Sequence, residues 1–269
     1  MESVHYKDLE GKVVVVTGAS RGIGRAIAKS FAEQRAIVVV NSRTHDGASQ
    51  TVEEIRSRGG VAHAAVGDVG NPSEAREMIT NAVNRHGRLD VLISNAAVNP
   101  VAPLLTVDQS KWEEAQRVNL WGLFHCAQPA ARQMIDQGGG CIVAVGSPGG
   151  VDAYSAQVPY STSKAGLHML AMGMAWEWGP YAIRTNVVQP GWIDTSLNQS
   201  YLSDQDVRDR VTQQIPLRRI GAPHEVAPAV LWLCSDAASY VNGATIEVDG
   251  GQLAGRPTVV AKRLERLRF

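Results

Sequence analysis

Short apolar runs alternate with longer amphipathic segments along most of this chain. The runs are rich in β-branched residues, which favour strands, and they cover residues 12–17, 36–41, 61–66, 89–94, 141–146, 184–189 and 245–248. Helical periodicity fills most of the intervals between them. Strands that alternate with helices imply parallel βαβ units, and near-continuous valine runs are typical of strands that are covered on both faces. The pattern predicts an α/β fold, a doubly wound parallel sheet of about seven strands with helices on both faces.

The length of the chain bounds the number of domains. With 269 residues and 44% hydrophobic content, the sequence can bury one large core. We expect a single catalytic domain at 1–255 and a C-terminal extension at 256–269. Ligands of such sheets gather outside the carboxyl ends of the strands. The polar, irregular stretch at 194–215 is interpreted as a mobile cover over that site.

Charge and cysteine content narrow the class of partner. Lys plus Arg and Asp plus Glu both number 26, so no basic field favours nucleic acid or an anionic membrane. The first eight residues carry charges where a signal peptide needs an apolar run, and no stretch reaches the length of a membrane span. The three cysteines lie far apart, and the seven histidines form no ligand cluster. We expect a cytoplasmic protein with a small-molecule partner, without disulfides and without a metal.

A glycine-rich turn follows the first predicted strand and precedes a helical run at 25–34. It has the sequence Thr17-Gly-Ala-Ser-Arg-Gly-Ile-Gly24. Glycines let backbone amides approach phosphate oxygens, and a helix N-terminus adds partial positive charge. A lone glycine triplet also occurs in ordinary tight turns, but here strand, turn and helix come in the order that a dinucleotide site requires. We predict that this loop binds a dinucleotide pyrophosphate.

The spacing of these glycines resembles the Thr-Gly-x-x-x-Gly-x-Gly loop of the short-chain dehydrogenase/reductase family. The resemblance extends over nearly the whole chain, from about Leu9 to Gly251. It implies a Rossmann fold and a nicotinamide cofactor. The loop residues that it places on this cofactor are Gly18, Ser20, Arg21, Gly22, Ile23 and Gly24.

The end of the second predicted strand bears on the choice between NAD(H) and NADP(H). An NAD enzyme usually places an acid there, on the ribose 2′-hydroxyl, but this chain has Val40-Asn-Ser42-Arg43-Thr44. Arg43, beside Ser42, and Arg21 in the loop can instead pair with a 2′-phosphate. The alternative is that both arginines are solvated surface charges. We predict NADP(H).

Asp68 and Val69 follow the third predicted strand. Asp68 either accepts a hydrogen bond from the adenine amino group, with Val69 against the ring, or caps the next helix. Ser73 and the adjacent Asn71-Pro72 compete for the capping role. Both interpretations of Asp68 stay open.

Two later segments resemble family motifs that touch the cofactor. Ser94-Asn-Ala-Ala97 matches the family's Asn-Asn-Ala-Gly at Asn95 and Ala96, which implies contact with the ribose. Gln189-Pro-Gly-Trp-Ile-Asp-Thr195 resembles the Pro-Gly segment that wraps the nicotinamide. The residues implied there are Pro190, Gly191, Ile193 and Thr195.

Tyr160 and Lys164 stand four residues apart in a segment with helical periodicity, so their side chains share one face. Ser147 ends the fifth predicted strand thirteen residues before Tyr160. A tyrosine and a lysine on one helix face are common by themselves. Their coincidence with a strand-end serine and a phosphate loop indicates a catalytic site.

This spacing resembles the Ser, Tyr, Lys core of the same family. By that match Ser147, Tyr160 and Lys164 are catalytic, and Tyr160 and Lys164 also contact the cofactor. Asn119, in Arg117-Val-Asn-Leu-Trp-Gly122, matches a fourth catalytic residue that shapes a helix bend and holds a proton-relay water. Hydride transfer builds negative charge on a carbonyl oxygen, which Ser147 and a proton from Tyr160 can stabilise. We expect the Lys164 ammonium and the nicotinamide's charge to lower the pKa of Tyr160.

Substrate selection is expected from residues in the loops around this core. They are Val98, Asn99, 148–154, Trp192 and, in the cover, Tyr201 and Leu202. These mix apolar and neutral groups without an arginine cluster for a carboxylate or phosphate, so a neutral or carrier-tethered ketone is expected. Within the family the chain most resembles 3-oxoacyl carrier-protein reductases and NADPH-dependent ketone reductases.

The sequence also bears on assembly. The helix that holds Met169, Met172 and Trp176 is apolar on much of its circumference, which fits core packing or, as the resemblance implies, subunit contacts in a homotetramer. The extension at 256–269 is either a solvated tail or a short amphipathic arm that grips a neighbouring subunit.

Three functions are consistent with the sequence. The leading one is an NADPH-dependent reductase of a ketone or 3-oxoacyl carbonyl with Tyr160 as proton donor. The second is an alcohol or polyol dehydrogenase that works oxidatively. The third is a non-catalytic, cofactor-sensing binding protein, from which we would expect loss of Tyr160 or Lys164.

Overall fold

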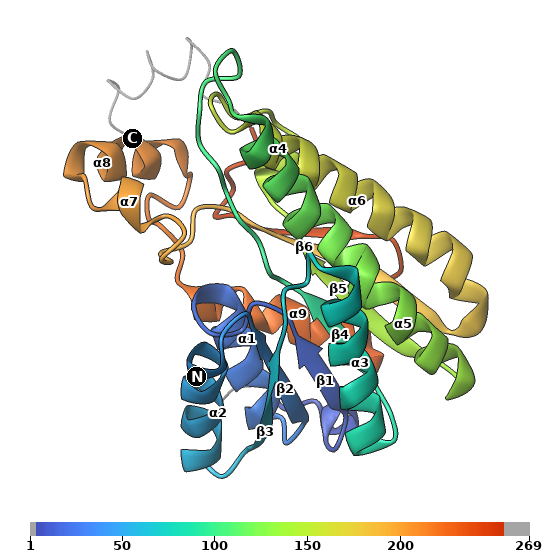
Figure 1. The fold of residues 1–269 in the computed structure, drawn as a ribbon. Coiled ribbons are helices and arrows are strands. Elements are labelled where there is room, and N and C mark those ends of the chain that lie inside the picture. The colour runs from blue at the N-terminus through green and yellow to red at the C-terminus, as the bar shows by residue number, and fades with distance from the viewer. Residues whose placement is uncertain (1–3, 256–269) are drawn as a thin grey trace.

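Seven parallel strands form one sheet in the order β3-β2-β1-β4-β5-β6-β7 in the computed structural model, which describes residues 4–255 (Figure 1). The strands are Val13–Val16 (β1), Ile37–Ser42 (β2), Val61–Val66 (β3), Val91–Ser94 (β4), Gly140–Val145 (β5), Ile183–Pro190 (β6) and Thr245–Val248 (β7). The predicted doubly wound sheet is confirmed. The order reverses between β1 and β4, and a ligand crevice forms at such a point in these folds.

Helices connect the strands as the periodicity predicts. They are Gly22–Glu33 (α1), His45–Ser57 (α2), Pro72–His86 (α3), Gln109–Ala115 (α4), Gly122–Asp136 (α5), Val158–Trp178 (α6), Gln199–Leu202 (α7), Gln205–Gln214 (α8) and Ala227–Cys234 (α9). A π-helical segment, Gln116–Trp121, joins α4 to α5. Short 3-10 turns occur at Lys7–Leu9, Pro148–Gly150, Gly179–Tyr181, Pro223–Glu225 and Asp236–Ala238.

The sheet separates two apolar layers. Val14 and Val16 of β1 pack with α1, α2 and α9 on one face, whereas Val13 and Val15 pack with α3, α5 and α6 on the other. Alternate side chains of a strand point to opposite faces, so an all-valine strand buried on both sides fits the centre of the sheet. The three cysteines lie in these layers as buried, free thiols.

The stretch at 194–215 differs from its prediction. It contains α7 and α8 rather than irregular chain, and the pair stands at one end of the molecule (Figure 1). Asp204 caps α8, because its side chain accepts hydrogen bonds from the amides of the next turn. Leu202, Val211 and Ile215 form a small apolar cluster of their own. The prediction of an irregular segment is wrong. The polar composition of α8 gives it no strong apolar periodicity, although Asp204 caps it as a regular helix.

Within residues 4–255, no helix is both long and apolar enough to cross a membrane. The extension at 256–269, for which a tail and a subunit-gripping arm were both considered, lies outside the described residues.

Candidate active site

One cavity of about 570 Å³ runs along the carboxyl ends of the strands, within the range of roughly 300–1,000 Å³ common for small-molecule sites. Segments that follow all seven strands contribute to its wall. The predicted site residues that line it are Gly18, Ser20, Arg21, Gly22, Ile23, Ser42, Arg43, Asp68, Val69, Asn95, Ala96, Ser147, Tyr160, Lys164, Pro190, Gly191, Ile193 and Thr195. Gly24 and Asn119 are not among the described lining residues. They contact residues that are, namely Asn95 and Val98.

The glycine-rich loop is held close to the segment after β4. Gly18 has a φ of +60°, and a Cβ at this position would stand 2.8 Å from Ala96 Cα. The Asn95 side chain donates to the carbonyl oxygens of Thr17 and Gly18, at 2.9 and 3.1 Å, and a Cβ on Gly24 would collide with that amide. Only glycine satisfies these two positions. The backbone cradle that results, at the start of α1, fits a dinucleotide pyrophosphate.

Asn41 fixes this loop from the other side and was missed by the sequence analysis. Its Oδ1 accepts from the Gly18 amide at 3.2 Å, and its Nδ2 donates to the carbonyl oxygens of Ala65 and Gly67, each at 3.1 Å. The only signal in the sequence is an asparagine at the end of a valine run. Asn41 therefore ties the ends of β1, β2 and β3 together.

Arg21 and Arg43 are exposed side chains on the wall of the cavity. Neither pairs with an acidic group in the described part of the chain. Arg25 also lines the cavity but forms an ion pair with Glu54. Two unpaired guanidinium groups at this end can hold a phosphate with bidentate hydrogen bonds.

Asp68 does not cap α3. Asn71 does, because its side chain accepts from the amides of Ser73 and Glu74. Asp68 instead accepts from Arg117 Nη1 at 2.7 Å and from the Gly70 amide at 2.9 Å. Burial raises the pKa of Asp68, but the hydrogen bonds from Arg117 and the Gly70 amide outweigh burial and hold this pKa below its usual value. The capping interpretation is wrong, and the carboxylate remains on the cavity wall.

Ser147, Tyr160 and Lys164 meet at the inner end of the cavity. Tyr160 and Lys164 lie one turn apart on α6, as their spacing predicts. Lys164 Nζ donates to the Val145 carbonyl at 2.7 Å and stands 5.8 Å from the centre of the Tyr160 ring. Ser147 Oγ accepts from the Gly149 amide at 3.1 Å, which orients the hydroxyl at the start of the turn after β5.

Burial shifts both titrating groups toward their neutral forms. Burial raises the pKa of Tyr160, and a hydrogen bond with Ser147 opposes this shift. Burial also lowers the pKa of Lys164 to about 8. The expected lowering of the Tyr160 pKa depends also on the charge of a bound nicotinamide and stays a prediction for the cofactor-bound site. In the protein by itself, desolvation of the phenolate outweighs the hydrogen bond with Ser147.

Asn119 lies in the π-helical segment Gln116–Trp121, which is the helix bend expected there. Its Oδ1 accepts from the Val98 amide at 2.8 Å, and its Nδ2 donates to the Val98 carbonyl and to Ser163 Oγ, both at 2.9 Å. Ser163 in turn donates to the Tyr160 carbonyl at 2.6 Å. Asn119 thus joins the loop after β4 to the helix that carries Tyr160.

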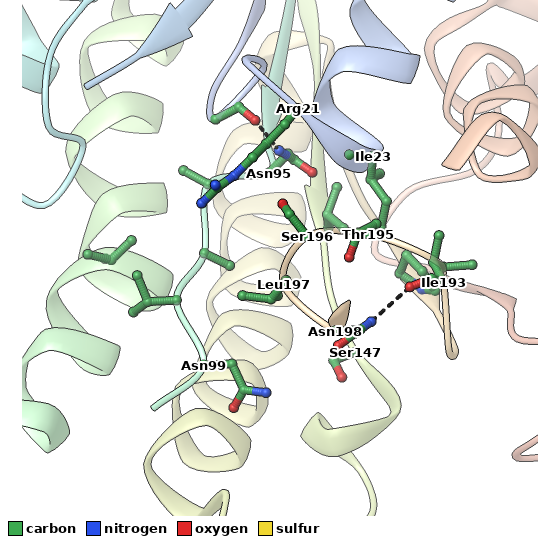
Figure 2. Close-up of a pocket in the computed structure, with 18 of the residues that line it drawn as sticks. Arg21, Ile23, Asn95, Asn99, Ser147, Ile193, Thr195, Ser196, Leu197 and Asn198 are labelled. Carbon is green, nitrogen blue, oxygen red and sulfur yellow. Dashed lines mark hydrogen bonds between the residues drawn. The ribbon is translucent and has the colours of Figure 1, made fainter. Parts of the chain in front are cut away.

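The segment after β6 closes one side of the cavity. Figure 2 shows Ile193, Thr195 and Leu197 between Arg21 at the phosphate-loop end and Ser147 at the other end. Asn198 Nδ2 donates to the Ile193 carbonyl at 2.9 Å, which folds the segment back on itself.

The substrate end matches its prediction in part. Val98, Asn99, Pro148, Tyr154 and Trp192 line the cavity. The two residues expected from the cover, Tyr201 and Leu202, are absent from the described lining, and Leu202 is buried in the apolar cluster of α7 and α8. For Leu202 the prediction is wrong because this side chain packs into the apolar cluster. The lining residues that were missed are Gln157, Leu197, Asn198 and Gln252, which no sequence pattern marks.

Comparisons with known proteins identify the family. Residues 18–252 match the family model described as "Enoyl-(Acyl carrier protein) reductase". The chain is 42% identical to the L-rhamnose 1-dehydrogenase (NAD(P)(+)) of a Sphingomonas species, over 91% of this chain and 97% of that protein. It is 37% identical to the 3-oxoacyl-acyl-carrier-protein reductase FabG of Aquifex aeolicus, over 90% and 98%.

Solved structures agree with the sequence relatives. A gluconate 5-dehydrogenase from Burkholderia cenocepacia, solved in complex with NADP and tartrate, matches with a TM-score of 0.89 and 34% identity. The match covers 93% of this chain and 98% of that one. The chain therefore belongs to the short-chain dehydrogenase/reductase family, whose members here act as oxidoreductases on alcohol and carbonyl carbons.

Proposed function

We propose that this protein is an NADP(H)-dependent oxidoreductase that reduces a neutral ketone or 3-oxoacyl carbonyl, reversibly, with Tyr160 as the proton donor. The observation that carries the proposal is that Ser147, Tyr160 and Lys164 line the same cavity as the glycine cradle. Both residues whose loss would indicate a binding protein, Tyr160 and Lys164, are present and adjacent.

The roles of the side chains follow from their positions. A bound nicotinamide would supply the hydride in reduction and accept it in oxidation. The Ser147 hydroxyl, held by the Gly149 amide, hydrogen-bonds the substrate oxygen, and Tyr160 donates a proton to it as charge develops. Lys164 supplies positive charge beneath Tyr160, and its pKa of about 8 lets it exchange a proton near neutral pH. Asn119 positions the start of α6 through Ser163, whose hydroxyl donates to the Tyr160 carbonyl.

The preference for NADP(H) rests on Arg21 and Arg43. Neither forms an ion pair within the described residues. Arg43 directly follows β2, Arg21 lies in the loop before α1, and both line the cavity, so both can reach a 2′-phosphate there. The absence of an acid at 41–44 removes the usual partner of a free 2′-hydroxyl. A related structure was solved with NADP, and a related dehydrogenase is named for NAD(P).

Tyr160→Phe tests the mechanism. We expect NADPH to bind with unchanged affinity and kcat/KM to fall about 1,000-fold, because the only group removed is the proton donor. Tyr181→Phe, at an exposed position, is the matched control and should leave both quantities unchanged. Turnover by Tyr160→Phe close to that of the wild type would refute the mechanism.

A second candidate function is the oxidation of a sugar or polyol. The substrate end favours it, since Asn99, Tyr154, Gln157 and Gln252 are neutral hydrogen-bonding side chains. Relatives include dehydrogenases named for L-rhamnose and gluconate. The direction of the reaction in the cell depends on the ratio of the two cofactor forms.

We propose further that the protein is a homotetramer that uses the outer face of α6. Met169 and Trp176 of this helix are 66% and 85% exposed, and Trp121 adds to the apolar surface on the neighbouring segment. Large exposed apolar patches mark interfaces. Trp176→Lys should shift the mass measured by light scattering to a smaller species, and an unchanged mass would contradict the use of this face. Lys111→Trp, on exposed α4, serves as the control for a surface substitution.

A further inference from the structure

The substrate end of the cavity carries two pairs of neutral side chains that the catalytic set does not use. In the first pair, Asn99 Nδ2 donates to Gln157 Oε1 at 3.2 Å. In the second, Gln252 Nε2 donates to the Tyr154 hydroxyl at 2.9 Å. All four side chains line the same cavity as the catalytic residues, and they come from three segments that are far apart in the sequence.

Each pair leaves hydrogen-bonding capacity unused. Asn99 Oδ1 and Gln252 Oε1 are buried and have no hydrogen-bond partner among the described residues. Buried amide oxygens are almost always paired, and an unpaired one costs free energy. The Tyr154 hydroxyl accepts from Gln252, and burial raises the pKa of Tyr154 to about 12, so the hydroxyl keeps a proton that it can donate. Each pair therefore combines unused acceptors with a donor.

Tyr154 lies close to the reacting atoms. A Cβ on Gly149 would stand 3.3 Å from Tyr154 Cδ2 and 3.4 Å from Ser147 Oγ, so the tyrosine ring and the catalytic hydroxyl flank one point. Gln157 is the residue directly before α6, three positions ahead of Tyr160. A substrate whose reacting oxygen lies on Ser147 and Tyr160 would have its neighbouring atoms beside these two pairs.

The backbone around the pairs is fixed. Asn119 binds both the amide and the carbonyl of Val98, the residue before Asn99. The loop after Asn99 is tied to the loop before α6, since the Ala102 amide donates to the Ala156 carbonyl at 2.9 Å. The Asp249 carboxylate accepts from the amides on either side of Gln252. The backbone that carries the side-chain amides of Asn99, Gln157 and Gln252 is thus held in place. Such preorganisation is a property of binding sites that select by hydrogen bonds.

Apart from Lys164, the charged side chains among the described lining residues lie toward the cofactor end of the cavity. The charged side chains among the described lining residues are Arg21, Arg25, Arg43, Asp68 and Lys164. Arg21 and Arg25 lie at the start of α1, Arg43 and Asp68 follow β2 and β3, and Lys164 is bonded to the Val145 carbonyl. Among the described residues, a carboxylate or phosphate on the substrate would find no counter-ion from the cavity lining beside Asn99 or Gln252.

We propose that the Asn99–Gln157 and Tyr154–Gln252 pairs bind the hydroxyl groups of a compact, neutral, polyhydroxylated substrate, a monosaccharide or polyol. A hydroxyl group donates and accepts at once, so it matches a pair that offers both. An acyl chain has neither donors nor acceptors along its length and would leave these buried atoms unpaired. The inference rests on the proposed oxidoreductase chemistry, chooses the sugar or polyol of the second candidate function as its substrate class, and argues against the 3-oxoacyl alternative.

The test compares substrates that differ only in hydroxyl groups. Full-length enzyme is assayed with NADP+ on neutral aldopentoses, aldohexoses and C5–C6 polyols, and on 2-hydroxytetrahydropyran, the parent ring without the other hydroxyls. A 3-oxobutanoyl thioester is assayed with NADPH. We expect kcat/KM for the best hydroxylated substrate to exceed that for 2-hydroxytetrahydropyran by about 100-fold.

Two variants assign the effect to the pairs. Asn99→Leu and Gln252→Leu should each lower kcat/KM for the hydroxylated substrate by about 10-fold or more, chiefly through KM, and leave 2-hydroxytetrahydropyran unaffected. Asn84→Leu, on the exposed face of α3, is the matched control. Equal losses on both substrates, or a thioester that outperforms every hydroxylated compound, would overturn the inference while the proposed function stands. No turnover of any compound would overturn the proposed function itself.

Discussion

The two ends of the cavity are built in different ways. At the cofactor end, backbone geometry makes the site: Gly18 and Gly24 allow the loop to approach Ala96 and Asn95, and Asn41 and Asn95 hold that loop by its amides and carbonyls. At the substrate end, side chains make the site. There, residues such as Asn99, Tyr154 and Gln252 project from separate loops into the same space.

The difference predicts that the two ends tolerate substitution unequally. A backbone cradle tolerates almost no change, because every substitution adds a Cβ where another chain segment already lies. Loop side chains can be exchanged without moving the backbone that carries them. We therefore expect substitutions of the cradle glycines to damage binding and stability together, and substitutions of side chains that project into the cavity, such as Arg43 or Gln252, to change only selectivity.

Gly18→Ala should give the largest effect at the cofactor end. Its φ of +60° is strained for alanine, and the added Cβ would stand 2.8 Å from Ala96 Cα. We expect a loss of about 2–4 kcal/mol in the free energy of unfolding and a Kd for NADPH that rises about 100-fold, measured by urea denaturation and by fluorescence titration.

Gly59→Ala is the control for Gly18→Ala. Gly59 has a φ of +82°, but a Cβ there meets nothing within 4 Å, and the residue lies outside the cavity. Gly59→Ala therefore measures the cost of a positive φ for alanine alone, about 1 kcal/mol, without the collision with Ala96 that Gly18→Ala adds. If the two variants lose the same stability and keep the same Kd, the cradle is not defined by close packing, and the contrast between the two ends fails.

Arg43→Asp should have the next largest effect, on selectivity alone. The ratio of kcat/KM for NADPH to that for NADH should fall about 100-fold, since a bidentate partner of the 2′-phosphate becomes a repulsive charge. Steady-state assays with both cofactors measure this ratio. Arg76→Asp, an exposed arginine on α3, should leave it unchanged. An unaltered ratio in Arg43→Asp would mean that Arg43 is a solvated surface charge.

The cofactor end could be predicted from the sequence because its determinants are local. Seven strand ranges agree with the structure to within about two residues at each boundary, since valine runs buried on both faces leave little choice of secondary structure. The spacing of Gly18, Gly22 and Gly24 and the four-residue interval between Tyr160 and Lys164 are distances along one turn or one helix. Local geometry converts such spacings directly into positions.

The substrate end could not be predicted because its determinants meet only in three dimensions. Gln252 reaches Tyr154 across 98 positions, and nothing in either neighbourhood marks the pair. The stretch at 194–215 was misinterpreted for a related reason. Its helices bury few side chains, so α8 lacks a strong apolar stripe, and the cap at Asp204 was the signal that could have revealed it.

The smallest predicted effect concerns His168, which lies beside Lys164, and it is a change in the pH dependence of stability. It lies one turn beyond Lys164 on α6, where its Nε2 is buried and packs against the backbone of Gly146. Burial and the charge of Lys164 lower the pKa of His168 to about 4 from an ordinary value of 6.5. Between these two values the unfolded chain binds more protons than the folded protein, so stability rises with pH across this window and is lost as pH falls through it.

Replacing His168 should therefore flatten the stability profile in weak acid. Relative to its stability at pH 7.5, the wild type should lose about 1–2 kcal/mol more than His168→Leu at pH 5, after a discount for partial exposure. Urea denaturation at the two pH values, at one protein concentration, measures the difference. His45→Leu, which removes an exposed imidazole on α2, should follow the wild type. If His168→Leu loses as much stability as the wild type, the imidazole is protonated in the folded protein, and the environment behind Lys164 is wetter than its burial indicates.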